Sequence, residues 1–311
     1  MSNSTTPRVA LIGMGEVGQI LAADLHGAGV THIAAWDRLF RVPGSAPLHA
    51  ARALGFLREM NSLSEAITGC SVVISAVTAG ECTAAAREAT HSLASGTYYF
   101  DLNSVSPETK NEAARTIEAV GGRYVEAAVM SPIAPKHIRS PIWIGGPHAR
   151  SFLPIAQSLG FSGAEVYSQT LGAASAAKMC RSVVIKGMEA LLAESLLTAR
   201  RHGVEQVVLD SLNDLIPAAD WRALAWYMVS RSLRHGARRA EEMHEAARTV
   251  TAAGIQPWMT EGCVKRQRWA ADHPEALYCD SLEQLLDTVL QRHPAIEREP
   301  CETLVPEALQ S

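Results

Sequence analysis

The amino-acid sequence predicts an α/β protein with two domains, a doubly wound sheet over residues 1–168 and an all-helical domain over residues 169–311. From Val9 to about Ser168, short apolar runs typical of strands alternate with helical patterns. The first of these runs leads directly into a glycine-rich turn. After Ser168 the strand patterns stop and only helical patterns follow. Such an order is typical of a doubly wound sheet whose ligand site lies at the carboxyl ends of the strands.

The glycine-rich turn has G-x-G-x-x-G spacing and lies between a predicted strand, Val9 to Ile12, and a predicted helix. Gly13 permits the tight turn, Gly15 lets the backbone approach a pyrophosphate, and Gly18 lets the helix pack close to the strand. The first N–H groups of the helix favour a phosphate. The turn therefore predicts a Rossmann-type dinucleotide site. Its expected cofactor contacts are Gly13, Met14, Gly15, Glu16, Val17 and Gly18.

A second apolar run, His32 to Asp37, ends in a carboxylate. Asp37 follows the glycine turn at roughly the spacing of 20 residues that dinucleotide-binding sequences show. A carboxylate there accepts hydrogen bonds from the adenosine ribose and repels a 2′-phosphate, which favours NAD. Arg38 and Arg41 stand nearby and leave NADP open. The alternative interpretation is a tight strand–helix turn that binds no ligand.

The remaining elements follow from the same patterns. Strands are expected at residues 56–59, 71–77, 98–101, 123–129, 142–145 and 164–167, and helices at residues 48–54, 62–68 and 81–93. Ser106 and Pro107 are suited to cap and begin a further helix that ends at Gly121. In the second domain, helices are expected at residues 172–202, 204–215, 221–234, 237–253, 258–271 and 282–292, with a loosely packed tail from Pro294.

Composition excludes several classes of protein. Hydrophobic residues make up 47% of the 311 residues and the formal net charge is −4, which is typical of a globular protein. We find no basic run of the kind that binds nucleic acid and no apolar run of about 18 residues that would span a membrane. The six cysteines are scattered, form no C-x-x-C pair and lie at no metal-ligand spacing. The polar N-terminus is unlike a secretory signal, so we expect a cytoplasmic protein without a metal.

Three loops follow the strands that end near Val77, Asp101 and Val129, where the nicotinamide end of a dinucleotide would lie. The expected cofactor contacts from these loops and from the second strand are Arg38, Val77, Thr78 and Asn103. The expected substrate contacts from these loops are Ser104, Met130, Ser131 and Pro132. Among the loop side chains, the hydroxyl groups of Ser104 and Ser131 and the amide of Asn103 can hold a carboxylate or a hydroxyl. Each polar residue could instead cap a helix or stabilise a turn.

Lys178 lies on the long helix predicted from residue 172, among small residues that let another surface come close. A partly desolvated lysine has a lowered pKa and can exchange a proton near neutral pH. Ser182 lies one helical turn further on, on the same face. By residue type alone, a solvated helix lysine is the more common case.

Taken together, these motifs resemble the β-hydroxyacid dehydrogenases, the family of 6-phosphogluconate and 3-hydroxyisobutyrate dehydrogenase. The turn at Gly13 to Gly18 is similar to the family's opening motif, and Asp101 to Pro107 resembles D-x-S-T-x-x-P. Glu126 to Pro132 stands where the family carries D-A-P-V-S-G-G, and Gly172 to Lys178 resembles its G-x-x-x-x-x-K helix. The resemblance implies an NAD(P)-dependent oxidoreductase acting on a small hydroxy acid or related polar alcohol, with Lys178 as the catalytic general acid and base.

The sequence also departs from the family pattern. The two asparagines that follow the family's lysine are replaced by Arg181 and Ser182, and we assign to Ser182 the orienting role of the missing asparagine. His235, Arg238 and Arg239 lie at helical spacing and are candidates to bind a substrate anion, even across a dimer interface. Alternatively, they belong to a charged helix face paired with Glu241, Glu242 or Glu245.

The resemblance further implies a homodimer formed through the helical domain and an anionic small-molecule substrate. Two other functions stay open. An imine reductase shares this architecture, but such enzymes commonly replace the lysine, so Lys178 argues against it. The altered substrate loop and the missing asparagine also leave open a dinucleotide-binding protein without turnover.

Overall fold

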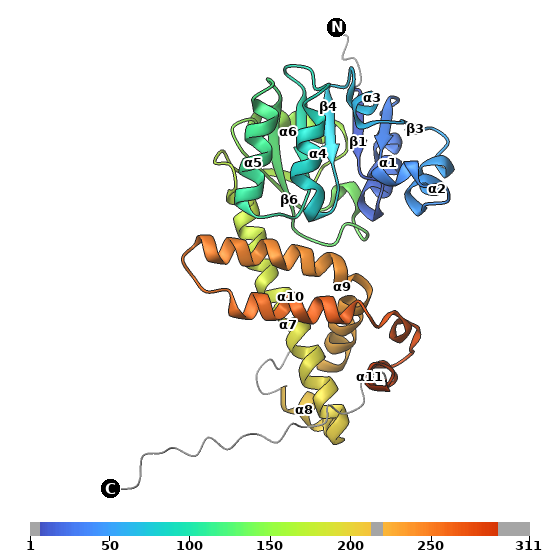
Figure 1. Cartoon of the computed structure of the whole chain (residues 1–311), viewed down its shortest axis with the longest axis vertical. Helices are drawn as coiled ribbons and strands as arrows, with labels where there is room; N and C mark the ends of the chain where they lie inside the picture. The colour runs from blue at the N-terminus through green and yellow to red at the C-terminus, as the bar shows by residue number, and fades with distance from the viewer. Residues whose placement is uncertain (1–6, 213–219, 292–311) are drawn as a thin grey trace. The chain divides into compact units, whose positions relative to one another are not determined.

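A computed structural model describes residues 7–212 and 220–291 of the chain (Figure 1). The chain divides into two compact units. The first consists of Met1–Gly187 together with Ala237–Arg268, and the second of Met188–Gly236 together with Trp269–Ser311.

An eight-stranded sheet forms the centre of the first unit. Its strands are β1 (Val9–Ile12), β2 (Ile33–Trp36), β3 (Arg58–Glu59), β4 (Val72–Ser75), β5 (Tyr98–Asp101), β6 (Arg123–Val129), β7 (Ile142–Gly145) and β8 (Ala164–Ser168). The spatial order is β3-β2-β1-β4-β5-β6-β7-β8. All neighbouring strands are parallel except β6 and β7, which pair antiparallel. The order reverses between β1 and β4, which confirms the predicted doubly wound sheet.

Helices cover both faces of the sheet because alternate strand residues point to opposite sides. The helices are α1 (Glu16–Gly27), α2 (Ala46–Ala53), α3 (Leu63–Ile67), α4 (Cys82–Ala89), α5 (Pro107–Glu118) and α6 (Ala149–Ser158). Short 3-10 turns are η1 (Arg38–Arg41), η2 (Ala79–Glu81) and η3 (His137–Arg139). Leu11 packs with α1 and α6 in one core cluster, whereas its neighbour Ile12 packs with α3, α4 and α5 in the other.

Helices of 7 to 32 residues follow the sheet, with no further strand among the described residues, as predicted. They are α7 (Ala173–His202), α8 (Glu205–Ser211), α9 (Trp221–Ala252), α10 (Trp258–Ala270) and α11 (Leu282–Gln291), with a 3-10 turn η5 (Pro274–Tyr278). The prediction of two helices at residues 221–234 and 237–253 was wrong, because α9 runs through Gly236 without a break. One glycine inside a helix costs only about 1 kcal/mol, and Gly236 is buried in packing contacts. The end of the helix predicted at residues 204–215 and the tail from Pro294 lie outside the described residues.

The compact units divide the helices differently from the predicted domain boundary at residue 168. The secondary structure changes there, since β8 ends at Ser168, but Ala237–Arg268 belongs to the same unit as the sheet. The second unit has its own core, which includes Leu196, Ala225 and Leu285. Across the part of the chain that the structure describes, none of the helices has the length and apolar character needed to cross a membrane.

Candidate active site

The glycine turn between β1 and α1 is built so that two of its positions admit no side chain. Gly13 has φ of +95°, and a Cβ there would lie 2.5 Å from the carbonyl oxygen of Ala76. A Cβ on Gly18 would lie 2.0 Å from the carbonyl oxygen of Gly13, so α1 packs directly against the turn. Gly15 differs, because a Cβ there would meet nothing within 4 Å. It stands at the N-cap of α1 with no side-chain hydrogen bond to the helix, which leaves open space at the N-terminus of α1 for a phosphate.

Asp37, at the end of β2, is held against this turn. Its Oδ2 accepts a hydrogen bond of 2.8 Å from the backbone N–H of Met14, and its Oδ1 accepts one of 2.9 Å from Leu39. Each carboxylate oxygen keeps a second lone pair, so the group can still accept from a ribose hydroxyl. Arg38 is exposed and forms an ion pair with Glu81.

The other residues predicted around the cofactor lie on or beside the turn and at the ends of β4 and β5. Val17 packs against the core, whereas Glu16 and Thr78 are exposed. Asn103 is buried, and its side-chain amide forms hydrogen bonds within the protein. The Asn103 Oδ1 accepts a 2.7 Å hydrogen bond from the N–H of Val77, and its Nδ2 donates to Ser75 Oγ at 3.0 Å. Asn103 therefore fixes the loop after β4.

The structure brings Lys178 of α7 and Ser104, in the loop after β5, into direct contact. Lys178 Nζ donates to Ser104 Oγ at 2.6 Å. Part of the Lys178 side chain is exposed, but protein atoms surround its amine. This burial lowers the pKa of Lys178 to about 7, an effect opposed by the charge of Glu242 and assisted by Lys186 and other cations. Both the neutral amine and the ammonium form are therefore accessible near neutral pH.

The start of α7 is anchored to the end of the sheet by Glu126 of β6. The carboxylate is fully buried and accepts hydrogen bonds from the N–H groups of Gly172 at 2.9 Å and Ala174 at 3.3 Å. It also accepts from Ser175 Oγ at 2.7 Å. A negative charge at a helix N-terminus is stabilised by the unpaired N–H groups and the helix dipole. Glu126 thus fixes the first turn of the helix that carries Lys178.

A second lysine lies on the same face of α7. Lys186 Nζ contacts Ser182 Oγ at 3.2 Å and Glu242 Oε2, on α9, at 2.7 Å. Burial alone would raise the pKa of Glu242, but Lys186 and the neighbouring cations lower it to about 2. Lys186 was not among the predicted site residues. The signal was present in the sequence, because Lys178, Ser182 and Lys186 follow one another at intervals of four residues, a spacing that places them on one helix face.

A second carboxylate of α9 holds the segment next to Ser104. Glu245 is buried and accepts from the N–H of Ser106 at 2.9 Å and from Thr109 Oγ1 at 2.7 Å. Ser106 also caps α5 as predicted, since its Oγ accepts from the N–H of Thr109. From the sequence, Glu245 is expected only as a possible partner of the cationic residues of the same helix face. In the structure it connects α9 to the loop that contacts Lys178.

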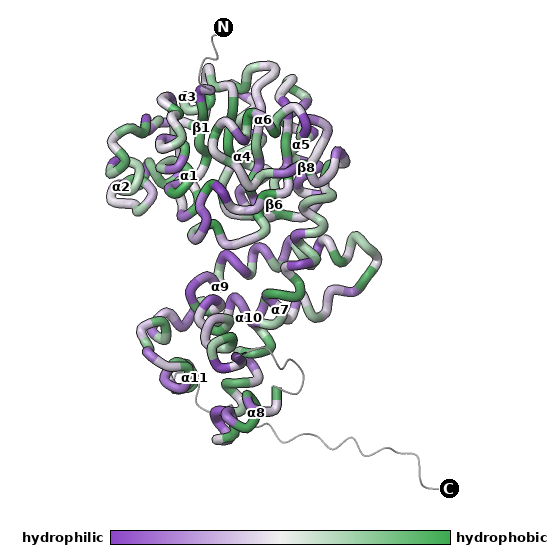
Figure 2. The backbone as a smooth tube through the Cα atoms, turned by 180° about the vertical axis from the view of Figure 1, so that it is seen from behind, coloured by the Kyte–Doolittle hydropathy of each residue, from purple (hydrophilic) through white to green (hydrophobic). Residues whose placement is uncertain are grey.

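The remaining predicted substrate residues do not all gather around Lys178. Arg238 is exposed and lies 3.4 Å from Glu242 and 4.0 Å from Glu16, as in the alternative of a paired, charged helix face. Figure 2 shows hydrophilic segments that alternate with more hydrophobic ones along α9. Arg239 is buried, which lowers the pKa of its guanidinium. His235 lies in the second compact unit.

The loop after β6 keeps its hydrogen bonds local. The N–H of Met130 donates to the carbonyl oxygen of Pro141 at 2.9 Å, and Ser131 Oγ donates to the carbonyl oxygen of Pro132 at 3.3 Å. Met130 and Ser131 are half-buried and Pro132 is exposed, and of these three residues Ser131 alone has a polar side chain.

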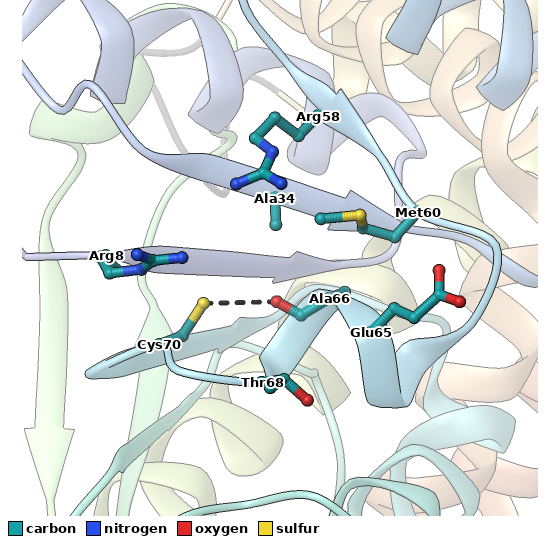
Figure 3. Close-up of a pocket in the computed structure, with 8 residues that line it drawn as sticks. All are labelled: Arg8, Ala34, Arg58, Met60, Glu65, Ala66, Thr68 and Cys70. Atoms are coloured by element: carbon teal, nitrogen blue, oxygen red, sulfur yellow. Dashed lines mark hydrogen bonds between the residues drawn. The ribbon is translucent and has the colours of Figure 1, made fainter.

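A pocket of about 350 Å³ lies at the opposite end of the sheet (Figure 3). It is lined by Arg8, Ala34, Arg58, Met60, Glu65, Ala66, Thr68 and Cys70. Arg8 precedes β1 and Cys70 precedes β4, whereas the glycine turn follows β1. The pocket is therefore separate from the site around Lys178. Among the described residues, no three His, Cys, Asp or Glu side chains come together as a metal site would require.

Comparison with known proteins adds two family matches. Residues 8–149 match the NAD binding domain of 6-phosphogluconate dehydrogenase, and residues 199–270 match a domain of unknown function, DUF1932. An uncharacterised 28.5 kDa protein from Methanothermus fervidus is 28% identical over 170 residues, or 54% of this chain. The matched segment spans 63% of the length of that relative.

Two solved structures are similar over nearly the whole chain. A conserved hypothetical protein from Sinorhizobium meliloti 1021 is 34% identical, with a TM-score of 0.70 and coverage of 93% of this chain and 97% of that one. A conserved protein of unknown function, described as structurally similar to 3-hydroxyacid dehydrogenases, is also 34% identical, with a TM-score of 0.64 and coverage of 88% and 99%. The chain belongs to the β-hydroxyacid dehydrogenase family.

Within this family the chain is divergent, as the sequence predicted. Mycobacterium tuberculosis 3-hydroxyisobutyrate dehydrogenase, solved with L-serine, shares the fold at 19% identity and a TM-score of 0.67, covering 93% of this chain and 100% of that one. An imine reductase from Streptomyces aurantiacus shares it at 19% identity and a TM-score of 0.53, covering 92% and 99%. Other proteins of this fold were solved with NADP+ or with NAD+.

Proposed function

We propose that this protein is a nicotinamide-dinucleotide-dependent dehydrogenase in which Lys178 is the general acid and base. The observation that carries the proposal is the 2.6 Å contact between Lys178 Nζ and Ser104 Oγ, made by a lysine whose pKa is lowered to about 7. A general base works best when its pKa lies near the working pH. The family supports the same role for this lysine.

The residues of the glycine turn fit a dinucleotide. The open space at Gly15 and the N–H groups at the start of α1 suit a pyrophosphate, and Asp37 suits the adenosine ribose. Asp37 favours NAD, and the ion pair with Glu81 engages the Arg38 that would otherwise attract a 2′-phosphate. Val77 and Thr78 lie on the nicotinamide side, and Asn103 acts by holding their loop. When bound, the cofactor supplies the hydride acceptor.

The residues of the chain then move the proton. In the oxidation direction, the neutral amine of Lys178 accepts the hydroxyl proton of the substrate, while the carbon that bears this hydroxyl gives up its hydride. In the reduction direction, the ammonium group of Lys178 protonates the oxygen of the substrate carbonyl. Ser104 holds the Lys178 amine in place, and Ser182 orients the reacting oxygen from the same helix face.

We infer that the substrate is a small anionic hydroxy acid or a related polar alcohol. In the loop of Met130, Ser131 and Pro132, the Ser131 hydroxyl is the group suited to bind its carboxylate. The surplus cations around Lys178 favour an anion. Arg238, Arg239 and His235 are secondary candidates, and the family resemblance supports a homodimer through the helices.

The direct test is NADH formation, followed at about 340 nm over a panel of hydroxy acids. We expect Lys178→Met to lower kcat by at least about 100-fold, because the loss of a general base usually costs this much. NADH binding, measured by its fluorescence, should stay unchanged. Lys265→Met replaces an exposed lysine of the same unit and should behave as the wild type. Normal turnover by Lys178→Met would overturn the proposal.

An imine reductase is the second candidate, since enzymes with this activity share the fold. Lys178 speaks against it. Turnover of cyclic imines together with no turnover of any hydroxy acid would reverse this order. Tight NADH binding without turnover of either panel would instead favour a dinucleotide-binding protein.

A further inference from the structure

The proposed mechanism leaves a buried ion pair next to Lys178 without a role. Lys186 is 9% exposed and lies two helical turns after Lys178 on α7. Its ammonium group contacts the Glu242 carboxylate at 2.7 Å and Ser182 Oγ at 3.2 Å. The Glu242 side chain, which is 13% exposed, also lies 3.4 Å from Arg238.

A pair of this kind is not explained by stability. Removing two charges from water costs free energy that their attraction often fails to recover, and well-packed apolar residues frequently do as well or better. Residues with strongly shifted pKa values, together with the charged groups that shift them, cluster at functional sites. We therefore look for the role of the Lys186–Glu242 pair in the proton transfer by Lys178.

We propose that Glu242 and Lys186 are positioning residues whose opposite charges set the fraction of Lys178 that is neutral at working pH. The inference rests on the proposed acid and base role of Lys178. Glu242 favours the ammonium form by attraction, and Lys186 disfavours it by repulsion. Because Lys186 contacts both Ser182 and Glu242, each charge is held at a fixed place along the face of α7 that carries Lys178.

Charged groups from three helices influence Lys178. They are Lys110 of α5, Lys186 of α7 itself, and Arg238 and Glu242 of α9. Since the neighbouring cations lower the pKa of Glu242 to about 2, its carboxylate stays ionised wherever Lys178 titrates. Lys110 is paired with Asp101 at 3.0 Å, so the removal of Glu242 chiefly leaves the repulsion by Lys186 and Arg238 on Lys178 uncompensated. Without Lys186, the Glu242 carboxylate would act on it more strongly.

The test measures the protonation of Lys178 without using activity. The full-length protein is labelled with trace acetic anhydride over a range of pH, and acetylation of the peptide with Lys178 is followed by mass spectrometry. We expect Glu242→Gln to move the midpoint of labelling down by about one pH unit and Lys186→Met to move it up by about as much. The double variant should return close to the wild-type midpoint, because it removes one charge of each sign.

Matched variants control for folding and for unspecific charge effects. Glu241→Gln changes the exposed neighbouring carboxylate, and Lys265→Met changes an exposed lysine, and neither should move the midpoint. Glu242→Asp keeps the negative charge and should stay near the wild type. Lys186→Met leaves Glu242 unpaired and could unfold for that reason. In that case, the labelling midpoints of Glu242→Gln and of the double variant still show whether the two charges act on Lys178 in opposite directions.

Midpoints that stay at the wild-type value in Glu242→Gln, or that move in the same direction in both single variants, would overturn the inference. The outcome is separate from that of the proposed function. Opposite shifts in a protein that turns over no substrate would support the charge relationship and contradict only the dehydrogenase assignment.

Discussion

At the scale of single residues, the glycine turn contains one glycine that the fold requires, Gly18, and one that cofactor binding is proposed to require, Gly15. Gly18 has no room for a Cβ, which would lie 2.0 Å from the carbonyl oxygen of Gly13. Gly15 has room in the protein, but a side chain there would occupy the space proposed for the pyrophosphate. The same substitution at the two positions should therefore have different consequences.

We expect Gly18→Ala to lower the free energy of unfolding by about 3 kcal/mol, because the added methyl group forces α1 away from β1. Gly15→Ala should fold with a stability within about 0.5 kcal/mol of the wild type and bind NADH about tenfold more weakly. Urea unfolding and NADH fluorescence measure the two effects. Tight NADH binding by Gly15→Ala would contradict the site placed at this turn.

Asp37 is the residue that should decide between the two cofactors. Asp37→Asn keeps an oxygen that can accept from the Met14 N–H but removes the charge that repels a 2′-phosphate. We expect the Kd for NADH to rise about tenfold and the preference for NADH over NADPH to narrow. Binding titrations with both cofactors check this. An unchanged ratio of the two Kd values would show that Asp37 does not face the ribose.

At the scale of elements, α7 depends on a carboxylate that reaches it from the sheet. The Glu126 carboxylate accepts hydrogen bonds from two N–H groups and one hydroxyl at the start of α7. Gly145, on the neighbouring strand, makes room for it, since a Cβ there would lie 2.3 Å from Glu126 Oε1. The position of Lys178 is thus linked to β6 and β7.

We expect Glu126→Gln to lower the free energy of unfolding by about 2 kcal/mol, because the amide cannot accept all three hydrogen bonds and has lost the charge that favours a helix N-terminus. Hydrogen exchange should accelerate at residues 172–178 before it changes elsewhere. Glu165→Gln, in the exposed part of β8, is the matched control. If hydrogen exchange in Glu126→Gln accelerated equally along the whole unit, Glu126 would not be a local anchor of the start of α7.

Elements with a strong local pattern could be predicted from the sequence. The strands β1, β5, β6 and β7 have the predicted bounds because each is a short apolar run between turn residues. The antiparallel pairing of β7 could not be read from such a run, since it depends on the path of the chain after β6. The continuity of α9 through Gly236 was missed because packing outweighs the low helix propensity of one glycine.

In the candidate site, too, residues that belong to a local motif could be predicted, whereas contacts between distant parts of the chain could not. Lys178 and Ser104 were found from motifs, and the structure joins them. Glu242 was named only as a possible partner of nearby cationic residues, and its contact with Lys186 was missed because it joins two helices that are distant in the sequence. Asn103 is predicted to contact the cofactor, and the contacts of its amide with Val77 and Ser75 could not be foreseen from the sequence. A sequence pattern identifies residue types, but it does not show where a buried side chain finds its partner.

At the scale of the whole molecule, the first compact unit combines parts of the chain that lie far apart in the sequence. The sheet supplies the glycine turn and Ser104, α7 supplies Lys178, and the Ala237–Arg268 segment supplies Glu242 and Glu245. The account therefore predicts one ionisation that is felt in both directions of the reaction. It belongs to Lys178, whose pKa burial lowers to about 7.

The most direct measurement is kcat/KM for oxidation and for reduction as a function of pH, in the wild type and in Lys178→Met. Oxidation needs the neutral amine, so its kcat/KM should rise as the pH increases through about 7. Reduction needs the ammonium form, so its kcat/KM should fall over the same range. Both dependences should disappear, together with most of the turnover, in Lys178→Met. Profiles that keep the same midpoint in Lys178→Met would contradict the account, because another group would then carry the proton.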